Sequence, residues 1–334
     1  MTSTNSSATA VSPQDAAKPL PLWRSVLVRP ETMTLVLLAA AFVIACLLSP
    51  FFASLTFILE SATYYAEFSI IALVLTLVII AGEIDLSPAS TMALTACLFG
   101  TVCQAGLPIG WAMAASLAAG LAMGAFNGFM VLWLRLPSLM VTIGTLIMYR
   151  GLAQVLAGDR SIGKFPAWFV GIDYRTLFGV PVPVLVFVAA SLVLAFVLGA
   201  TILGRQIYQI GTSEIAARHA GIKVRRIKFG LFLAMGLTSA LCGLLAASRL
   251  ASVRYDLATG GELQMVLIVM LGGTYIFGGR GTIAGTFIAS WLLVIIATGM
   301  TVANIPVTYQ LTVMGLLLII SIIATNTIYA RNQR

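Results

Sequence analysis

Apolar runs of about 20 residues, separated by short breaks, dominate this chain, and a helix of roughly that length crosses the hydrocarbon core of a bilayer. The breaks fall where Gly, Pro or charged residues cluster. A run inside a bilayer must satisfy its own backbone hydrogen bonds, which favours helix throughout. The sequence therefore predicts an all-α, polytopic membrane protein with about ten transmembrane helices. The expected spans are residues 33–52, 57–81, 87–105, 108–133, 138–158, 182–203, 229–250, 262–278, 282–301 and 306–326.

Composition excludes several other classes of protein. Of the 334 residues, 60% are hydrophobic and 9% are charged, and 19 Lys and Arg with 11 Asp and Glu cannot cover the surface of a soluble protein of this length. The net charge of +8 does not indicate nucleic-acid binding, because the basic residues lie between the apolar runs. The four cysteines lie inside apolar runs without CxxC spacing and the single His has no partner His, so neither a disulfide framework nor a metal site is expected.

The distribution of basic residues predicts the orientation in the membrane. Loops on the cytoplasmic side carry an excess of Lys and Arg. With a cytoplasmic N-terminus, the inside segments hold 13 of the 19 basic residues: Lys18, Arg24, Arg29, Arg135, Arg205, Arg218, Lys223, Arg225, Arg226, Lys228, Arg280, Arg331 and Arg334. We therefore expect both termini in the cytoplasm of a bacterium and the spans in its inner membrane. Residues 1–30 are polar and Pro-containing and are expected to form a disordered tail, followed by a transmembrane domain at 31–328.

The longest polar insertion, residues 204–228, separates the sixth and seventh spans. Within it Ser213 is a suitable N-cap, the following residues favour helix, and Gly221 is a suitable C-cap. A short helix on the cytoplasmic face is expected. The segment is also consistent with a basic linker held by anionic lipid.

Two carboxylates, Glu83 and Asp85, stand at the junction of the second and third spans. Acidic groups beside a span are costly unless they meet water, backbone N–H groups or a cation. Ser87 and Pro88 also fit a helix start, with Ser87 as the cap. An ion-coupled secondary transporter would use acids of this kind, and Glu60, Glu67 or Asp85 would then carry the coupling ion.

Glycines mark two further segments. Residues 271–285 contain six of them, but no Gly-Lys-Ser/Thr sequence follows Gly278 and no strand precedes a dinucleotide fingerprint, so the chain is expected to hold no ATP site and no cofactor of its own. Here the glycines favour a helix break and close backbone approach. Gly120, Gly124 and Gly128 form a stripe at spacing four, which favours tight helix packing inside the subunit.

Several short motifs together resemble the permease subunits of bacterial ABC importers for sugars, in the family that serves ribose, arabinose, xylose, rhamnose and autoinducer-2 uptake. The Glu-x-Ala-Ala sequence at 214–217 with its following Gly is similar to their ATPase-coupling segment, and residues 83–87 resemble their Ile-Asp-Leu-Ser signature. Further matches are Asn127-Gly128, Tyr149-Arg150-Gly151 and residues 278–282. Glu83 and Pro88-Ala89 depart from the pattern, which commonly has Gly and Val-Gly there.

The resemblance implies a permease that catalyses nothing and works with a separate ABC ATPase, a periplasmic or lipid-anchored sugar-binding protein, and a second permease copy or a paralogue. It implies an inverted repeat of helices 2–5 and 7–10, and the rhamnose-type subgroup is the most similar. The implied ATPase-coupling residues are Glu214, Ala216, Ala217 and Gly221, with Glu214 paired to a group on the ATPase. The implied motif residues at helix junctions are Glu83, Asp85, Ser87, Gly278, Gly279 and Arg280. The outer loop, which the residues alone explain as an interfacial aromatic belt, would dock the binding protein through Arg160, Lys164 and Arg254.

Overall fold

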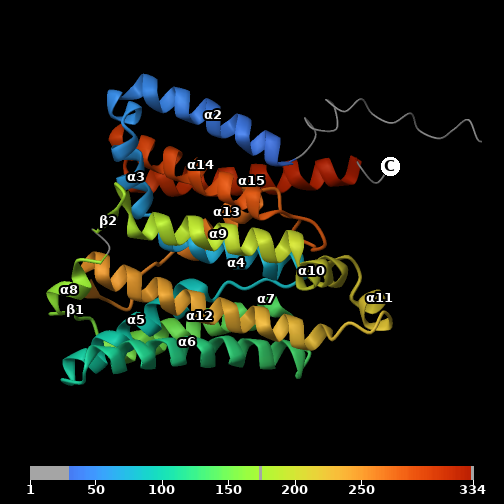
Figure 1. Ribbon diagram of the computed structural model, residues 1–334, viewed down its shortest axis with the longest axis horizontal. Helices are drawn as coiled ribbons and strands as arrows, with labels where there is room; N and C mark the ends of the chain where they lie inside the picture. Colours follow the sequence, from blue (N-terminus) through green and yellow to red (C-terminus); the bar gives the residue numbers. More distant parts are fainter. Residues whose placement is uncertain (1–29, 173–174, 332–334) are drawn as a thin grey trace, which may run out of the picture.

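A computed structural model describes residues 30–172 and 175–331 of the chain. Its long helices lie side by side in one bundle, with their axes roughly along the longest dimension (Figure 1). The expected tail at 1–30 lies outside the described residues except for Pro30, which begins the first described helix. The long helices are α2 (Pro30–Leu48), α4 (Ala66–Ile80), α5 (Pro88–Gln104), α6 (Ile109–Leu132), α7 (Ser138–Ala157), α9 (Val182–Ala200), α12 (Val224–Leu250), α14 (Ile283–Val302) and α15 (Val307–Arg331).

Short elements connect these helices. The short helices are η2 (Pro50–Ala53), α3 (Leu55–Thr63), α8 (Ala167–Val170), α10 (Ile202–Thr212), α11 (Glu214–His219) and α13 (Gly261–Leu271). Two-residue strands form two antiparallel pairs, β1 (Ile162–Gly163) with β4 (Ser252–Val253) and β2 (Thr176–Leu177) with β3 (Val180–Pro181). The insertion at 204–228 is thus mostly helical, since it contains most of α10, all of α11 and the first turn of α12.

The predicted all-α, polytopic membrane architecture is confirmed. Among the described residues, seven helices are long and apolar enough to cross a membrane, and an eighth span results if the bent pair α3 and α4 counts as one. The two halves of that pair meet at 69° around Tyr64 and Tyr65, where a single straight helix was expected. Helix α5 has 17 residues, at the lower end of the length range for a membrane-crossing helix, and α13 has 11, which is too short to cross alone, so the expected count of about ten spans is not confirmed.

The eighth predicted span, 262–278, is wrong in its extent. Helix α13 ends at Leu271, because Gly273 has a φ of +79° and Thr274 donates its N–H back to the carbonyl of Val269 over 3.3 Å. This is a Schellman cap, in which a left-handed residue closes the last turn of a helix. Residues 272–282 then run as a non-helical, glycine-rich loop to α14.

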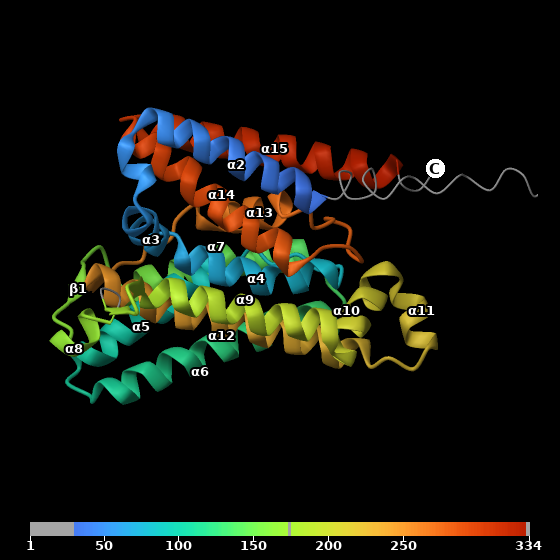
Figure 2. The same cartoon turned by 45° about the horizontal axis from the view of Figure 1, so that its top comes forward.

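The bundle has two different ends (Figures 1 and 2). Helices α10 and α11, the first turn of α12 and the last described turn of α15 lie at one end, which we call the α11 end. The β1–β4 pair and α8 lie at the opposite end, which we call the β1 end. Of the described segments whose basic residues were assigned to the cytoplasm, the loop between α6 and α7, α10, α11 and the start of α12 lie at the α11 end (Figures 1 and 2).

Helix α4 occupies the centre of the bundle, and its residues from Ser69 to Ile80 are all buried. Next to it, α6 and α12 pack closely enough that their backbones touch. A Cβ added to Gly120 would lie 2.5 Å from the carbonyl oxygen of Gly236, and one added to Gly124 would lie 2.3 Å from that of Phe232. The predicted use of the glycine stripe for packing inside the subunit is confirmed. The interface between the two helices therefore has no room for a side chain at these glycines.

Candidate functional site

The short helix α11 has the caps that the sequence predicted. The hydroxyl oxygen of Ser213 accepts the N–H of Ala216 at 3.3 Å. At the other end Gly221 has a φ of +79°, and Ile222 donates its N–H to the carbonyl of Ala217 over 3.1 Å. Gly adopts this left-handed backbone conformation far more easily than any residue with a Cβ. The caps fix the length of α11 and turn the chain back into α12.

Two faces of α11 have different surroundings. Ala217 is buried in a small apolar cluster with Ile210 and Val224, which anchors the helix to α10 and α12. Ile215 is 73% exposed and Ala216 is exposed as well. Ile215 thus leaves apolar surface exposed on the outer face of this six-residue helix, while the buried alanine holds the helix in place.

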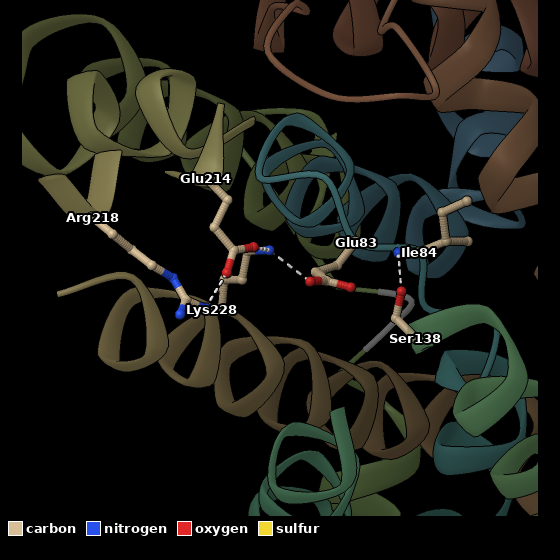
Figure 3. Close-up of polar contacts among 6 residues, drawn as sticks. All are labelled: Glu83, Ile84, Ser138, Glu214, Arg218 and Lys228. Carbon is tan, nitrogen blue, oxygen red and sulfur yellow. Dashed lines mark hydrogen bonds and ion pairs between the residues drawn. The ribbon is translucent and has the colours of Figure 1, made fainter. Parts of the chain in front are cut away.

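Lys228 joins this helix to the rest of the bundle. From the second turn of α12 its Nζ atom donates to Oε2 of Glu214 at 2.7 Å and to Oε1 of Glu83 at 2.6 Å. Figure 3 shows the two carboxylates pointing toward the Lys228 amine from different elements, Glu214 from α11 and Glu83 from the segment between α4 and α5. Arg218, one turn further along α11, forms a second ion pair with Glu214. The bridge thus connects two motifs that are 131 positions apart, at residues 83 and 214.

Burial strengthens this bridge. The side chain of Lys228 is 5% exposed, that of Glu83 is 14% exposed and that of Glu214 is 37% exposed. Partial burial opposes ionisation of Glu214, but the hydrogen bond and charge of Lys228, together with those of Arg218, outweigh it and hold the pKa of this carboxyl below its usual value. The sequence implied that Glu214 pairs with a group on a partner. The structure instead gives it two partners in its own chain.

The segment between α4 and α5 begins a second, fully buried network. Oδ1 of Asp85 accepts the N–H of Ser87 at 2.9 Å and its hydroxyl at 2.7 Å. The amide nitrogen of Asn127 on α6 donates to the Ser87 hydroxyl oxygen at 2.8 Å, and the Tyr149 hydroxyl on α7 donates to the Asn127 amide oxygen at 3.2 Å. Four motif residues distant in sequence therefore form one chain of hydrogen bonds. Such a network fixes the segment against both helices.

The expected capping role of Ser87 is wrong in its detail. Ser87 does occupy the N-cap position and Pro88 the first turn of α5, but the Ser87 side chain makes no capping hydrogen bond. Its hydroxyl is engaged by Asp85 and Asn127 instead. The segment is also held at Ile84, next to Asp85. Ile84 donates its N–H to the hydroxyl oxygen of Ser138, at the start of α7, over 3.2 Å (Figure 3).

The glycine-rich loop 272–282 lies against the C-terminal end of α4, where the Glu83 segment begins. Gly279 donates its N–H to the carbonyl of Ile80 over 2.8 Å. A Cβ added to Gly211, on α10, would lie 1.7 Å from that same carbonyl oxygen, and one added to Gly278 would lie 3.0 Å from the Cα of Gly82. The predicted close backbone approach in this loop is confirmed. Gly278, Gly279 and Arg280 are thus brought beside the Glu83 segment and α10.

The residues predicted to dock a binding protein lie at the opposite, β1 end. Lys164 follows β1 directly and Arg254 follows β4, and the two strands pair with Ile162 opposite Val253. Arg254 forms an exposed ion pair with Asp256, with 3.0 Å between Nε and Oδ1. Arg160 is exposed, two residues before β1. The fold therefore gathers these three residues around one strand pair, far from the Lys228 bridge.

The acids suggested for an ion-coupled carrier have different surroundings. Glu67, on α4, is 1% exposed and forms an ion pair with Arg249 of α12 at 2.9 Å. Glu60 is exposed on α3. Within the described residues, no group of three His, Cys, Asp or Glu side chains is arranged to hold a metal ion.

Sequence reasoning counted Lys228 only as one more basic residue, although it is the centre of the bridge. One signal was present: Lys228 lies four residues after Val224, at the edge of an apolar run, where a buried cation needs an acidic partner. The identity of that partner depends on how α11 folds back, which the local sequence does not contain.

Comparisons with known proteins agree on one family. Residues 57–322 match the family described as branched-chain amino acid transport system, permease component. The autoinducer 2 import system permease protein LsrD of Photorhabdus luminescens is 34% identical over 272 residues, which cover 80% of this chain and 82% of the relative. The protein of the same name from Escherichia coli K12 is 32% identical over 292 residues, 86% of this chain and 88% of the relative. No solved structure matches the chain. These relatives give no support to an ion-coupled carrier.

Proposed function

Because the chain belongs to the branched-chain amino acid transport permease family, it is a permease subunit of an ABC importer and not an enzyme, and we propose that it carries a monosaccharide or a related small polyol across the bacterial inner membrane. The cargo class rests on the relatives, which are named for the import of autoinducer 2. Autoinducer 2, rhamnose and ribose are the first compounds to test.

The observation that carries the proposed mechanism is the Lys228 bridge. A force applied to α11 reaches Lys228 through Glu214 and then reaches the α4–α5 segment through Glu83. From there the buried Asp85, Ser87 and Asn127 hydrogen bonds lead into α6. We propose that an ABC ATPase subunit docks on α11, with Ala216 and Gly221 at the contact, and that nucleotide binding there biases which side of the permease is open.

The arrangement in the membrane follows the same proposal. The α11 end faces the cytoplasm with both termini, and the β1 end faces outward, where Arg160, Lys164 and Arg254 receive a sugar-loaded binding protein. The chain then crosses ten times, with α13 and the loop 272–282 together serving as one crossing, and the second to fifth crossings repeat inverted as the seventh to tenth. A second permease copy or a paralogue completes the pathway.

Proteoliposomes containing the permease, its cognate ATPase and its binding protein test this function. Uptake of labelled autoinducer 2, rhamnose and ribose should require ATP inside the vesicle, and labelled leucine should not enter. Leucine uptake would move the cargo class to branched-chain amino acids. Uptake driven by an ion gradient without the ATPase would contradict the ABC mechanism.

Single cysteines test the orientation. In a cysteine-free variant, a cysteine at Trp168 in α8 should react with an impermeant maleimide from outside, and one at Ile215 should react only after the inner face is opened. Both positions are at least half exposed, so access differs only by the side of the membrane. Labelling of both from outside would overturn the orientation.

A further inference from the structure

A cavity of about 360 Å³ lies between α11 and the membrane helices at the α11 end. Its walls come from the last turn of α6, the turn between α6 and α7, the start of α7, α11 and the first turn of α12. The lining is mixed in chemistry. Apolar residues such as Val131, Leu132 and Leu136 contribute to it, and so do charged residues of α11, α12, the α6–α7 turn and the segment between α4 and α5.

Three guanidinium groups line this cavity, from Arg135, Arg218 and Arg225. Arg218 is paired with Glu214, but the exposed side chains of Arg135 and Arg225 have no hydrogen bond or ion pair within the described residues. The two carboxylates in the wall, Glu83 and Glu214, are already bonded to Lys228. The cavity therefore keeps an uncompensated positive charge.

The backbone around the cavity presents two helix ends. Ser138, in the wall, is the first residue of α7, whose first turn presents free N–H groups and the positive end of the helix dipole. Arg135 follows the C-terminal, negative end of α6 with a φ of +57°, so an arginine occupies the left-handed position that usually falls to Gly, and its charge offsets that end. The N-terminal turn of α7 therefore favours an anion here.

We propose that this cavity binds the headgroup phosphate of an anionic phospholipid, with its acyl chains against the apolar residues of the lining. The cavity lies where α6 ends and α7 and α12 begin, between these helix ends and α11, which is where the headgroups of a bilayer around these helices would be expected. Leu134, at 52% exposure, and Met140, at 72%, flank the turn and offer apolar surface to acyl chains. Charge and apolar surface thus occur together as they do in a phospholipid. A bound lipid would contact the wall that holds the Lys228 bridge, so it would act on coupling.

The test uses the purified full-length permease alone, by native mass spectrometry with phosphatidylglycerol and phosphatidylcholine added in equal amounts. Wild type should retain phosphatidylglycerol preferentially. The double variant R135Q/R225Q should lower the apparent affinity about 25-fold, since each basic residue near an anionic membrane surface contributes about fivefold. R205Q, which removes an exposed arginine of α10 at the same end, should bind as wild type does.

Several outcomes would overturn the proposal. Equal retention of both lipids, or unchanged phosphatidylglycerol binding in R135Q/R225Q, would remove the anionic lipid site. Full competition by inorganic phosphate would show a site for a free anion rather than for a lipid. If the double variant keeps its lipid but loses affinity for the ATPase subunit in a separate binding measurement, the cavity receives an acidic segment of that partner instead. Because lipid binding is measured without transport, its failure leaves the proposed function standing, and failure of the function leaves this measurement valid.

Discussion

Replacing Lys228 with Met should destabilise the protein more than removing either of its carboxylate partners. The amine is 95% shielded and satisfies both Glu83 and Glu214, so the variant leaves two negative groups facing each other without a cation. Removing one partner from a buried ion pair costs about 3–5 kcal/mol. Glu214 is 37% exposed and can regain water, so we expect the free energy of unfolding to fall by about 2 kcal/mol. Glu214→Gln, which loses the charge of its partly exposed ion pairs with Lys228 and Arg218, should cost about 1 kcal/mol.

Thermal unfolding in detergent, with coupling measured as ATPase stimulation by loaded binding protein, tests this expectation. Lys223→Met is the matched control, because Lys223 is exposed at the start of the same helix and the described residues give it no ion pair. The Lys228→Met variant should lose stimulation while the control keeps it. The stability of wild type should also fall as the pH drops through the lowered pKa of Glu214, since its bridge is present above the ordinary carboxyl pKa and lost on protonation. Equal stability of the two Lys variants, or additive effects of Lys228→Met and Glu83→Gln in a double-mutant cycle, would refute the bridge.

Three further predictions concern other parts of the molecule. Gly221→Val should cost about 1 kcal/mol at its left-handed φ and lower transport and ATPase stimulation together, while membrane insertion stays normal by protease protection. Reversing the charges of Arg160 and Lys164 should slow association with the loaded binding protein and reduce its salt dependence in surface plasmon resonance; unchanged rates would leave the loop as an interfacial belt. Gly236→Leu should abolish a stable fold in thermal unfolding, because even a Cβ at Gly236 would lie 2.1 Å from the Gly120 carbonyl oxygen, whereas Gly230→Leu, where a Cβ meets nothing, should be tolerated.

The features that the sequence predicted well depend on neighbours along the chain. Ser213 and Gly221 cap α11 through backbone groups within five positions, so their residue types were sufficient. The glycine stripe at 120, 124 and 128 is likewise a property of one helix face, and only its partner, α12, required the fold. Long apolar runs predicted most of the membrane helices for the same local reason.

The errors arose where tertiary contacts override local preference. Hydropathy continues past Leu271, yet Gly272 and Gly273 end α13 there, because the loop that follows must lie against Ile80 and Gly82. Ser87 has the residue type of a cap, but Asp85 and Asn127 compete for its hydroxyl. The glycines of residues 271–285 did indicate a helix break, but not that it falls at Leu271, and nothing near Ser87 in the sequence indicates its partner Asn127 on α6.

Two of the proposed functional elements meet at the end of α4, and their geometry gives coupling a direction. The Lys228 bridge contacts the segment after α4 through Glu83, while the Gly279 N–H holds the last turn of α4 itself through Ile80. Helix α10, which precedes α11, contacts both the end of α4 and the glycine-rich loop 272–282. Gly211 packs on Ile80, and the Tyr208 hydroxyl donates to the Gly281 carbonyl at 2.7 Å. A displacement of α10 and α11 therefore acts on α4 from two sides at once. Because α4 is buried at the centre of the bundle, it cannot yield alone, and the helices packed on it must move with it.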